Sequence, residues 1–224
     1  MAVTVYGITA QKGAPAGSPN VISQLSPIYN PIAIGKPSFT MFPGLATTNE
    51  QANRSRVYYL QGDLAAPKIV EYSLTNNDAG NLSVLPQTFP HPNTSIAACN
   101  RAQSRLIAYQ ALESNNSLFS YDTDQEASTR IQNTDGLPPG TPLAMVAVLE
   151  NIYLYYGSSG RYLTKVALTK DGWQKPFQVP GSIHLAQGTC LSVTNSGTIN
   201  YVVYQQDGGD GFNIVEDTLD TREP

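Results

Sequence analysis

Arg56-Val57-Tyr58-Tyr59-Leu60-Gln61 is the stretch that decides the fold, because its pattern recurs three times further along the chain. The recurrences are Arg105-Leu106-Ile107-Ala108-Tyr109-Gln110, Ile152-Tyr153-Leu154-Tyr155-Tyr156-Gly157 and Asn200-Tyr201-Val202-Val203-Tyr204-Gln205. Their last residues are spaced 49, 47 and 48 apart, and a tyrosine stands one or two places before each. A shorter match, Val5-Tyr6-Gly7, lies 54 residues before Gln61. A period of this length predicts a repeat architecture, and we call the repeated stretches anchor strands.

Each anchor strand is flanked by two further strand-like segments. The segments that follow the anchors are Val21–Gln24, Ile69–Tyr72, Leu118–Tyr121, Leu163–Val166 and Ile214–Asp217, and the small inner strands that precede them are Ser38–Phe42, Ser95–Cys99, Pro142–Ala147 and Thr189–Val193. With 18 Gly and 16 Pro spread along the chain, no window is left for a long helix.

These patterns predict an all-β protein, a β-propeller of about five four-stranded blades in one domain over residues 1–224. The approximate repeats are 1–36, 37–93, 94–140, 141–186 and 187–220. In this register the first unit lacks its inner strand and the last lacks its outer strand, so the ring closes unusually or the termini share a blade.

The composition excludes several classes of function. Only 13% of the 224 residues are charged and the net charge is −4, so a nucleic-acid partner is not expected. No apolar stretch reaches the length of a membrane span, and the first residues do not read as a signal peptide. We expect the secretory pathway or the extracellular space if a signal peptide has been removed, and the cytoplasm otherwise.

Cysteine, histidine and asparagine give few site signals. Cys99 and Cys190 could form a disulfide or be two buried thiols, and small core residues on inner strands are the favoured interpretation. The two histidines show no zinc spacing, and nucleotide-binding motifs are missing, so we expect no metal and no cofactor. Glycosylation sequons begin at four asparagines, Asn53, Asn81, Asn93 and Asn115.

The repeated Arg-Val-Tyr-Tyr pattern followed by Ile-x-Glu resembles the fungal fucose-specific lectin family over roughly residues 38–217. The resemblance implies sugar sites between blades, where an Arg and a Glu from one blade bind hydroxyls and an aromatic ring, usually Trp, packs on the sugar. Arg56 and Glu71 match that pair in the second unit.

Elsewhere the implied sites are incomplete. In the third unit Arg105 matches, but Ser120 replaces the Glu. In the fifth, Glu216 matches and Asn200 replaces the Arg. The fourth unit has Ile152 and Lys165 at the two places. The single tryptophan, Trp173, is expected to face the fifth unit.

Two functions from different classes follow from this resemblance. Fungi use a lectin-like propeller of this kind in hetero-Diels–Alder cyclases of tropolone sesquiterpenoid pathways, which need an apolar pocket and one or two acid–base groups. The loss of lectin residues on a kept scaffold favours such an enzyme, with an o-quinone methide and a humulene-type alkene as substrates. Its pocket candidates are Arg56, Tyr58, Glu71, Arg105, Tyr155 and His184.

The alternative is a fucose- or glycan-binding lectin that uses Arg56 and Glu71, with Trp173 and Glu216 as further sugar-binding candidates. A structural propeller without catalysis is a third interpretation, and Arg56–Glu71 is then an inter-strand salt bridge. The expected partners are apolar or phenolic small molecules or glycans, and a homodimer is one candidate assembly.

Overall fold

The computed structural model describes residues 5–10, 20–26, 30–32, 44–51, 54–75, 78–101, 104–112 and 114–219. In this part of the chain all regular secondary structure is β-strand, which confirms the predicted all-β class. No helix in it is long and apolar enough to span a membrane.

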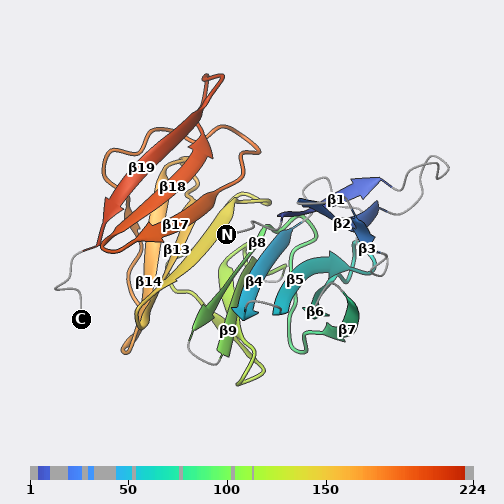
Figure 1. Cartoon of the computed structure of the whole chain (residues 1–224). Coiled ribbons are helices and arrows are strands. Elements are labelled where there is room, and N and C mark those ends of the chain that lie inside the picture. Colours follow the sequence, from blue (N-terminus) through green and yellow to red (C-terminus); the bar gives the residue numbers. More distant parts are fainter. Residues whose placement is uncertain are drawn as a thin grey trace.

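The described strands form five antiparallel sheets in chain order (Figure 1). The first sheet contains β1 (Val5–Ala10), β2 (Asn20–Ser26) and β3 (Asn30–Ile32). The second contains β4 (Leu45–Gln51), β5 (Arg54–Gln61), β6 (Lys68–Thr75) and β7 (Asp78–Val84), and the third contains β8 (Ile96–Arg101), β9 (Ser104–Gln110), β10 (Leu118–Asp122) and β11 (Ala127–Arg130). The fourth contains β12 (Leu143–Val148), β13 (Asn151–Gly157), β14 (Leu163–Thr169), β15 (Gly172–Trp173) and β16 (Phe177–Gln178), and the fifth contains β17 (Ser192–Ser196), β18 (Ile199–Gln205) and β19 (Phe212–Thr218).

The sheets are arranged side by side around their first strands. β4 contacts β8, β8 contacts β12, and β12 contacts β17, while the later strands of each sheet lie progressively further from this row. In Figure 1 the first and fifth sheets lie on opposite sides of the molecule. This radial order of meandering sheets is that of propeller blades, whereas the number of blades and the repeat boundaries stay predictions.

Two predicted inner strands were misplaced. The strand that pairs with β5 is β4, beginning at Leu45, while the predicted segment Ser38–Phe42 lies outside the described residues. β17 begins at Ser192, later than predicted. Both strands consist mainly of polar residues, so the sequence has no strong apolar alternation that would mark where they begin.

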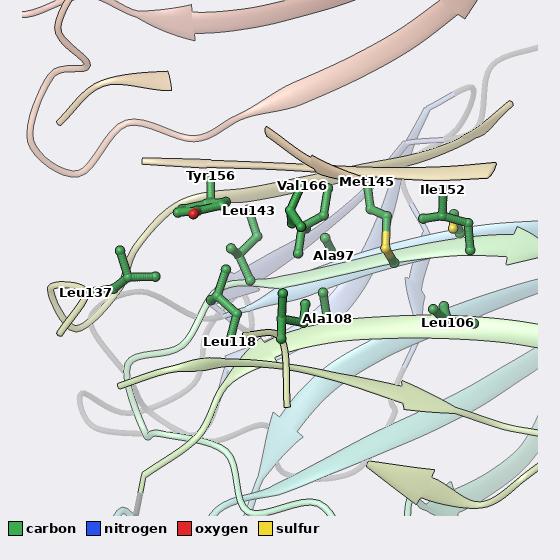
Figure 2. Close-up of a cluster of buried hydrophobic side chains, with 13 residues drawn as sticks. Ala97, Leu106, Ala108, Leu118, Leu137, Leu143, Met145, Ile152, Tyr156 and Val166 are labelled. Atoms are coloured by element: carbon green, nitrogen blue, oxygen red, sulfur yellow. The ribbon is translucent and has the colours of Figure 1, made fainter. Parts of the chain in front are cut away.

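Strand alternation sends the two faces of each sheet to different neighbours. On β5, Tyr58 and Leu60 pack against the third sheet, and Val57 and Tyr59 lie in a separate cluster on the opposite face. The third and fourth sheets meet through one apolar cluster, in which Tyr156, Val166 and Ile152 point toward the strands of the third sheet (Figure 2). Apolar contact between adjacent sheets therefore holds the described blades together.

Candidate functional site

Four charged and phenolic side chains meet between the second and third sheets. Nη1 of Arg56 lies 2.9 Å from Oε1 of Glu71. Arg105, from the third sheet, places Nε 3.2 Å from Oε2 of Glu71 and Nη2 3.4 Å from Oε1. The same Nε also donates to the hydroxyl of Tyr58 at 2.9 Å. One carboxylate is thus shared by two guanidinium groups from different sheets.

The β5–β6 pairing explains why three of these residues share a face. Tyr58 stands directly opposite Glu71, and Arg56 is two residues before Tyr58 on the same face of β5. Arg105 is on the face of β9 that carries Ile107 and Tyr109, which pack against Tyr58. The sequence prediction that treated Arg105 as the equivalent of Arg56 was therefore wrong.

The correct equivalence is one residue away. Leu106 lies on the face of β9 that packs against the fourth sheet, so Leu106, and not Arg105, takes the place of Arg56 in the third sheet. Aligning the anchors on Gln61 and Gln110 hid this offset, because a shift of one residue reverses the face of every side chain in a strand.

The cluster is partly open to water. The exposed fractions of the Arg56, Glu71 and Arg105 side chains are 18%, 7% and 20%. Burial, and then the negative charge of Glu71, raises the pKa of Tyr58 far above its ordinary value, so this phenol stays protonated. The cluster therefore presents guanidinium donors and one carboxylate acceptor at its open side, while the phenol of Tyr58 is fully buried beneath them.

Tyr155 lies elsewhere, in a second polar network between the fourth and fifth sheets. Its hydroxyl donates to Oδ2 of Asp217 and accepts from Nδ2 of Asn200 at 2.8 Å. Nζ of Lys165 is 2.8 Å from the same Oδ2, and both charged side chains are almost fully buried. Burial and Asp217 raise the pKa of the Tyr155 phenol strongly. Asn195 completes the network by donating to Oδ1 of Asn200 at 2.8 Å, and this closely paired, buried set favours a structural role.

The other predicted site residues are dispersed. Trp173 donates from Nε1 to Oγ of Ser120 at 3.0 Å, so it faces the third sheet and not the fifth. Glu216 is exposed and lies opposite Tyr201, on the face of the fifth sheet that turns away from the fourth. His184 is exposed and stacks edge-on against Tyr162 at 4.3 Å between ring centroids. The six pocket candidates do not share one cavity.

The cysteine and sequon predictions have mixed outcomes. Both cysteines are free, and Cys99 is buried as predicted, but Cys190 is exposed because it precedes the start of β17. Asn81 and Asn115 are exposed and Asn93 is half-buried, while Asn53 lies outside the described residues. In the described part of the chain, no group of three His, Cys, Asp or Glu side chains could hold a metal ion.

Sequence reasoning missed Asp217 and Tyr162. Asp217 was counted as part of a second strand, and its pairing with Lys165 from the preceding sheet leaves no local signal. Tyr162 follows a turn and carries no repeated pattern. A usable signal was the strict alternation of β19, which places Asp217 beside the inward Val215.

No family model and no curated protein matches this chain. Among solved structures, the six-bladed β-propeller lectin of Aleuria aurantia, which has a novel fucose recognition mode, matches with a TM-score of 0.63 and 20% identity, covering 91% of this chain and 72% of that one. A triple arginine-to-alanine mutant of AofleA from Arthrobotrys oligospora matches with a TM-score of 0.62 and 16% identity, covering 98% and 72%. These likenesses confirm the predicted lectin-like β-propeller fold.

Proposed function

We propose that this protein binds glycans, and specifically a fucoside, in the space between the second and third sheets. The observation that carries the proposal is the Arg56–Glu71 pair, held on one face and still partly open to water. The structural neighbours include an Aleuria aurantia lectin mutant in complex with α-methyl-L-fucoside, which supports a fucoside as the first ligand to test.

The chemistry of the pair suits adjacent sugar hydroxyls. Each hydroxyl both donates and accepts, so a carboxylate beside a guanidinium satisfies two neighbouring hydroxyls with charge-assisted hydrogen bonds. Arg105 holds the carboxylate from the other side and fixes its orientation before a ligand arrives. The pair is therefore preorganised for a polyhydroxyl ligand.

The aromatic component is separated from this pair. Trp173 lies at the next interface, between the third and fourth sheets, where Ser120 and Leu106 stand in the places of Glu71 and Arg56. One interface thus keeps the charged pair and another keeps the indole. We infer one weak fucoside site of this Arg–Glu type, at Arg56 and Glu71, in the described part of the chain, without the avidity that several equal sites would give.

Chromatography on immobilised fucose tests the proposal directly. We expect the protein to be retarded and to elute with free fucose, and Arg56→Ala to abolish the retardation. Arg130→Ala is the matched control, because Arg130 is a half-exposed arginine on β11 outside the cluster. The fucoside proposal would be rejected if the wild-type protein eluted at the same volume from a matrix carrying millimolar fucose as from the same matrix without fucose.

A second candidate function, hetero-Diels–Alder cycloaddition, is favoured by a separate cavity of about 340 Å³ between the third sheet and the linker that precedes it. Phe89, Tyr109 and Phe119 line it, and its size is at the lower end of small-molecule sites. An aromatic cavity of this kind suits two apolar partners held close together.

In that reaction the hydroxymethyl tropolone loses water to give an o-quinone methide, which adds across the alkene, so no oxidant is required. Incubation with the tropolone alcohol and humulenol is the test. We expect adduct to form faster than in buffer and Phe89→Ser to remove the acceleration. A rate equal to that in buffer would reject this candidate without affecting the fucoside proposal.

A further inference from the structure

A groove lies at the junction of the fourth and fifth sheets, away from the Arg56 cluster. It is a shallow hollow, open to solvent, with a volume of about 510 Å³. Its lining is mixed aromatic and polar, and we call it the rim groove; the residues are Tyr162, Ser182, Ile183, His184, Gln206 and Asp207. His184, one of the predicted pocket candidates, lines this groove and takes no part in the Arg56 cluster.

The rim groove is fixed by the backbone. The N–H of Asp207 donates to the carbonyl of His184 at 2.9 Å. Next to this bond, Leu185 and Gln206 form an isolated antiparallel β-bridge. The buried hydroxyl of Tyr204 accepts from the Ile183 N–H at 3.1 Å. Both walls are therefore held in place before a ligand binds, which lowers the entropy lost on binding.

The Tyr162 ring is positioned by the preceding turn. The N–H of Tyr162 donates to Oγ of Ser158 at 3.1 Å, and its carbonyl accepts from the Ser158 N–H at 2.9 Å. A Cβ on Gly160 would lie 3.1 Å from the ring, so the absence of a side chain there makes room for it. Tyr162 remains 37% exposed, and its ring forms one flank of the groove together with His184.

An ion pair separates the rim groove from a neighbouring cavity. Nη2 of Arg161 lies 2.9 Å from Oδ2 of Asp207, and both side chains are about half exposed. Arg161 lines the second cavity, of about 310 Å³, and Asp207 lines the rim groove. Arg161 has a left-handed backbone with φ of 60°, a conformation that non-glycine residues hold at a cost and that clusters at ligand sites.

The equivalent place between the second and third sheets shows which features are specific. There the N–H of Leu112 donates to the carbonyl of Phe89 at 3.0 Å, the same contact that Asp207 makes with His184. The backbone is thus repeated, while the side chains change from an exposed Phe and Leu to an exposed His and Asp. The fold therefore does not require the polar pair His184 and Asp207, since Phe89 and Leu112 make the same backbone contact with apolar side chains.

We propose that the rim groove binds a neutral oligosaccharide, with Tyr162 as the stacking surface and the Arg161–Asp207 pair as hydrogen-bonding groups. A sugar ring presents an apolar C–H face, which suits an amphipathic aromatic ring. Its hydroxyls suit an ion pair that offers donors and acceptors side by side. Because the two charges cancel, an anionic ligand gains no net attraction. This inference does not rest on the proposed function of the Arg56 cluster.

Binding to an immobilised panel of neutral oligosaccharides tests the inference, using fucosylated, galactosylated, β-glucan-derived and chitin-derived members. We expect at least one member to be retained by the wild-type protein and by Arg56→Ala. Tyr162→Ala and Asp207→Asn should each weaken that binding by about tenfold or more, as when an anchor residue is removed. Arg161→Gly removes the guanidinium without backbone strain and should have the same effect.

Leu64→Ala, an exposed apolar site in the turn between β5 and β6, is the control, and an unchanged thermal midpoint shows that each variant is folded. A panel on which no binding depends on Tyr162 would overturn the inference. Binding that is lost in Arg56→Ala but kept in Tyr162→Ala would also overturn it, while supporting the fucoside proposal. If fucose binding is absent while binding that depends on Tyr162 is kept, the rim groove is supported and the fucoside proposal is not.

Histidine NMR gives an independent measurement, because the chain has only two histidines. The Hε1 resonance of His184, assigned with His184→Gln, should shift on addition of the retained oligosaccharide. His91 serves as the internal reference, since its Nδ1 accepts from the Asn93 N–H at 3.0 Å in a different linker. Equal shifts of both resonances, or none of His184, would contradict binding in the rim groove.

Discussion

Nε of Arg105 lies 3.2 Å from Oε2 of Glu71, although the two residues belong to different sheets and are 34 positions apart. Glu71 also contacts Arg56, and in the described part of the chain it is the only carboxylate that pairs with two cationic side chains. The ion pair joins two neighbouring blades as well as two strands. Any change to Glu71 should therefore affect stability and ligand binding together.

We predict that Glu71→Gln lowers the free energy of unfolding by about 2–3 kcal/mol. Breaking a buried ion pair costs roughly 3–5 kcal/mol, and here the two arginines keep part of their contact with water. Urea unfolding followed by tryptophan fluorescence measures the change. Asp135→Asn is the control, because the Arg130–Asp135 pair is half exposed and should contribute much less. Equal losses of unfolding free energy in the two variants would show that the Glu71 cluster contributes no more than an exposed ion pair.

The sequence alone supported the strands and their period, because anchor residues repeat through buried tyrosines such as Tyr59 and Tyr109. It did not establish which way each anchor faces. Arg105 and Arg56 each follow a serine and precede an aliphatic residue, but one residue of offset places them on opposite sides of their sheets. Faces are decided by contacts with other sheets, which no local pattern encodes.

The same limit applies to Trp173 and Lys165. Trp173 was expected to face forward along the ring, yet its indole bonds to Ser120 in the preceding sheet. Lys165 was read as a lost glutamate, and only the fifth sheet supplies its partner, Asp217. The Arg56–Glu71 pair was predictable because both members lie on adjacent strands of one hairpin.

Asp217→Asn should destabilise the protein by about 3–5 kcal/mol, because it leaves the Lys165 ammonium buried without a counter-charge. The double variant Lys165→Met/Asp217→Leu should recover most of that loss, since it removes both buried charges. Equilibrium urea unfolding of Lys165→Met, Asp217→Leu and the double variant gives the coupling energy. Additive effects of the two substitutions would contradict the network that we describe.

Thiol titration should distinguish the two cysteines. Burial raises the pKa of the Cys99 thiol to about 12, so almost none of it is thiolate at pH 8. Cys190 is exposed and should react with Ellman's reagent at once, giving one thiol per native chain and two in denaturant. Cys190→Ser should remove the fast reaction. No reactive thiol in the native wild-type protein would contradict the free state of Cys190.

Alkaline pH should destabilise the fold through its buried tyrosines. Burial raises the pKa of Tyr59 and of Tyr156 to about 12, whereas the phenol ionises near 10 when it is exposed. The unfolded chain therefore loses these protons first, and stability that is complete below about pH 10 falls as the pH rises toward 12. Unfolding in urea at several pH values measures the slope. Tyr156→Phe should make that slope shallower, and an unchanged slope would rule out a contribution from Tyr156.

The hydrogen bond between Trp173 and Ser120 gives the last prediction. Ser120→Ala removes the acceptor of a partly buried indole N–H and should cost about 1 kcal/mol. Because Trp173 is the single tryptophan, its emission reports on the junction of the third and fourth sheets without interference. We expect the emission maximum to move in Ser120→Ala and to stay in place in Ser192→Ala, which alters an exposed serine on β17. An identical spectrum in both variants would mean that the indole does not depend on Ser120 for its position.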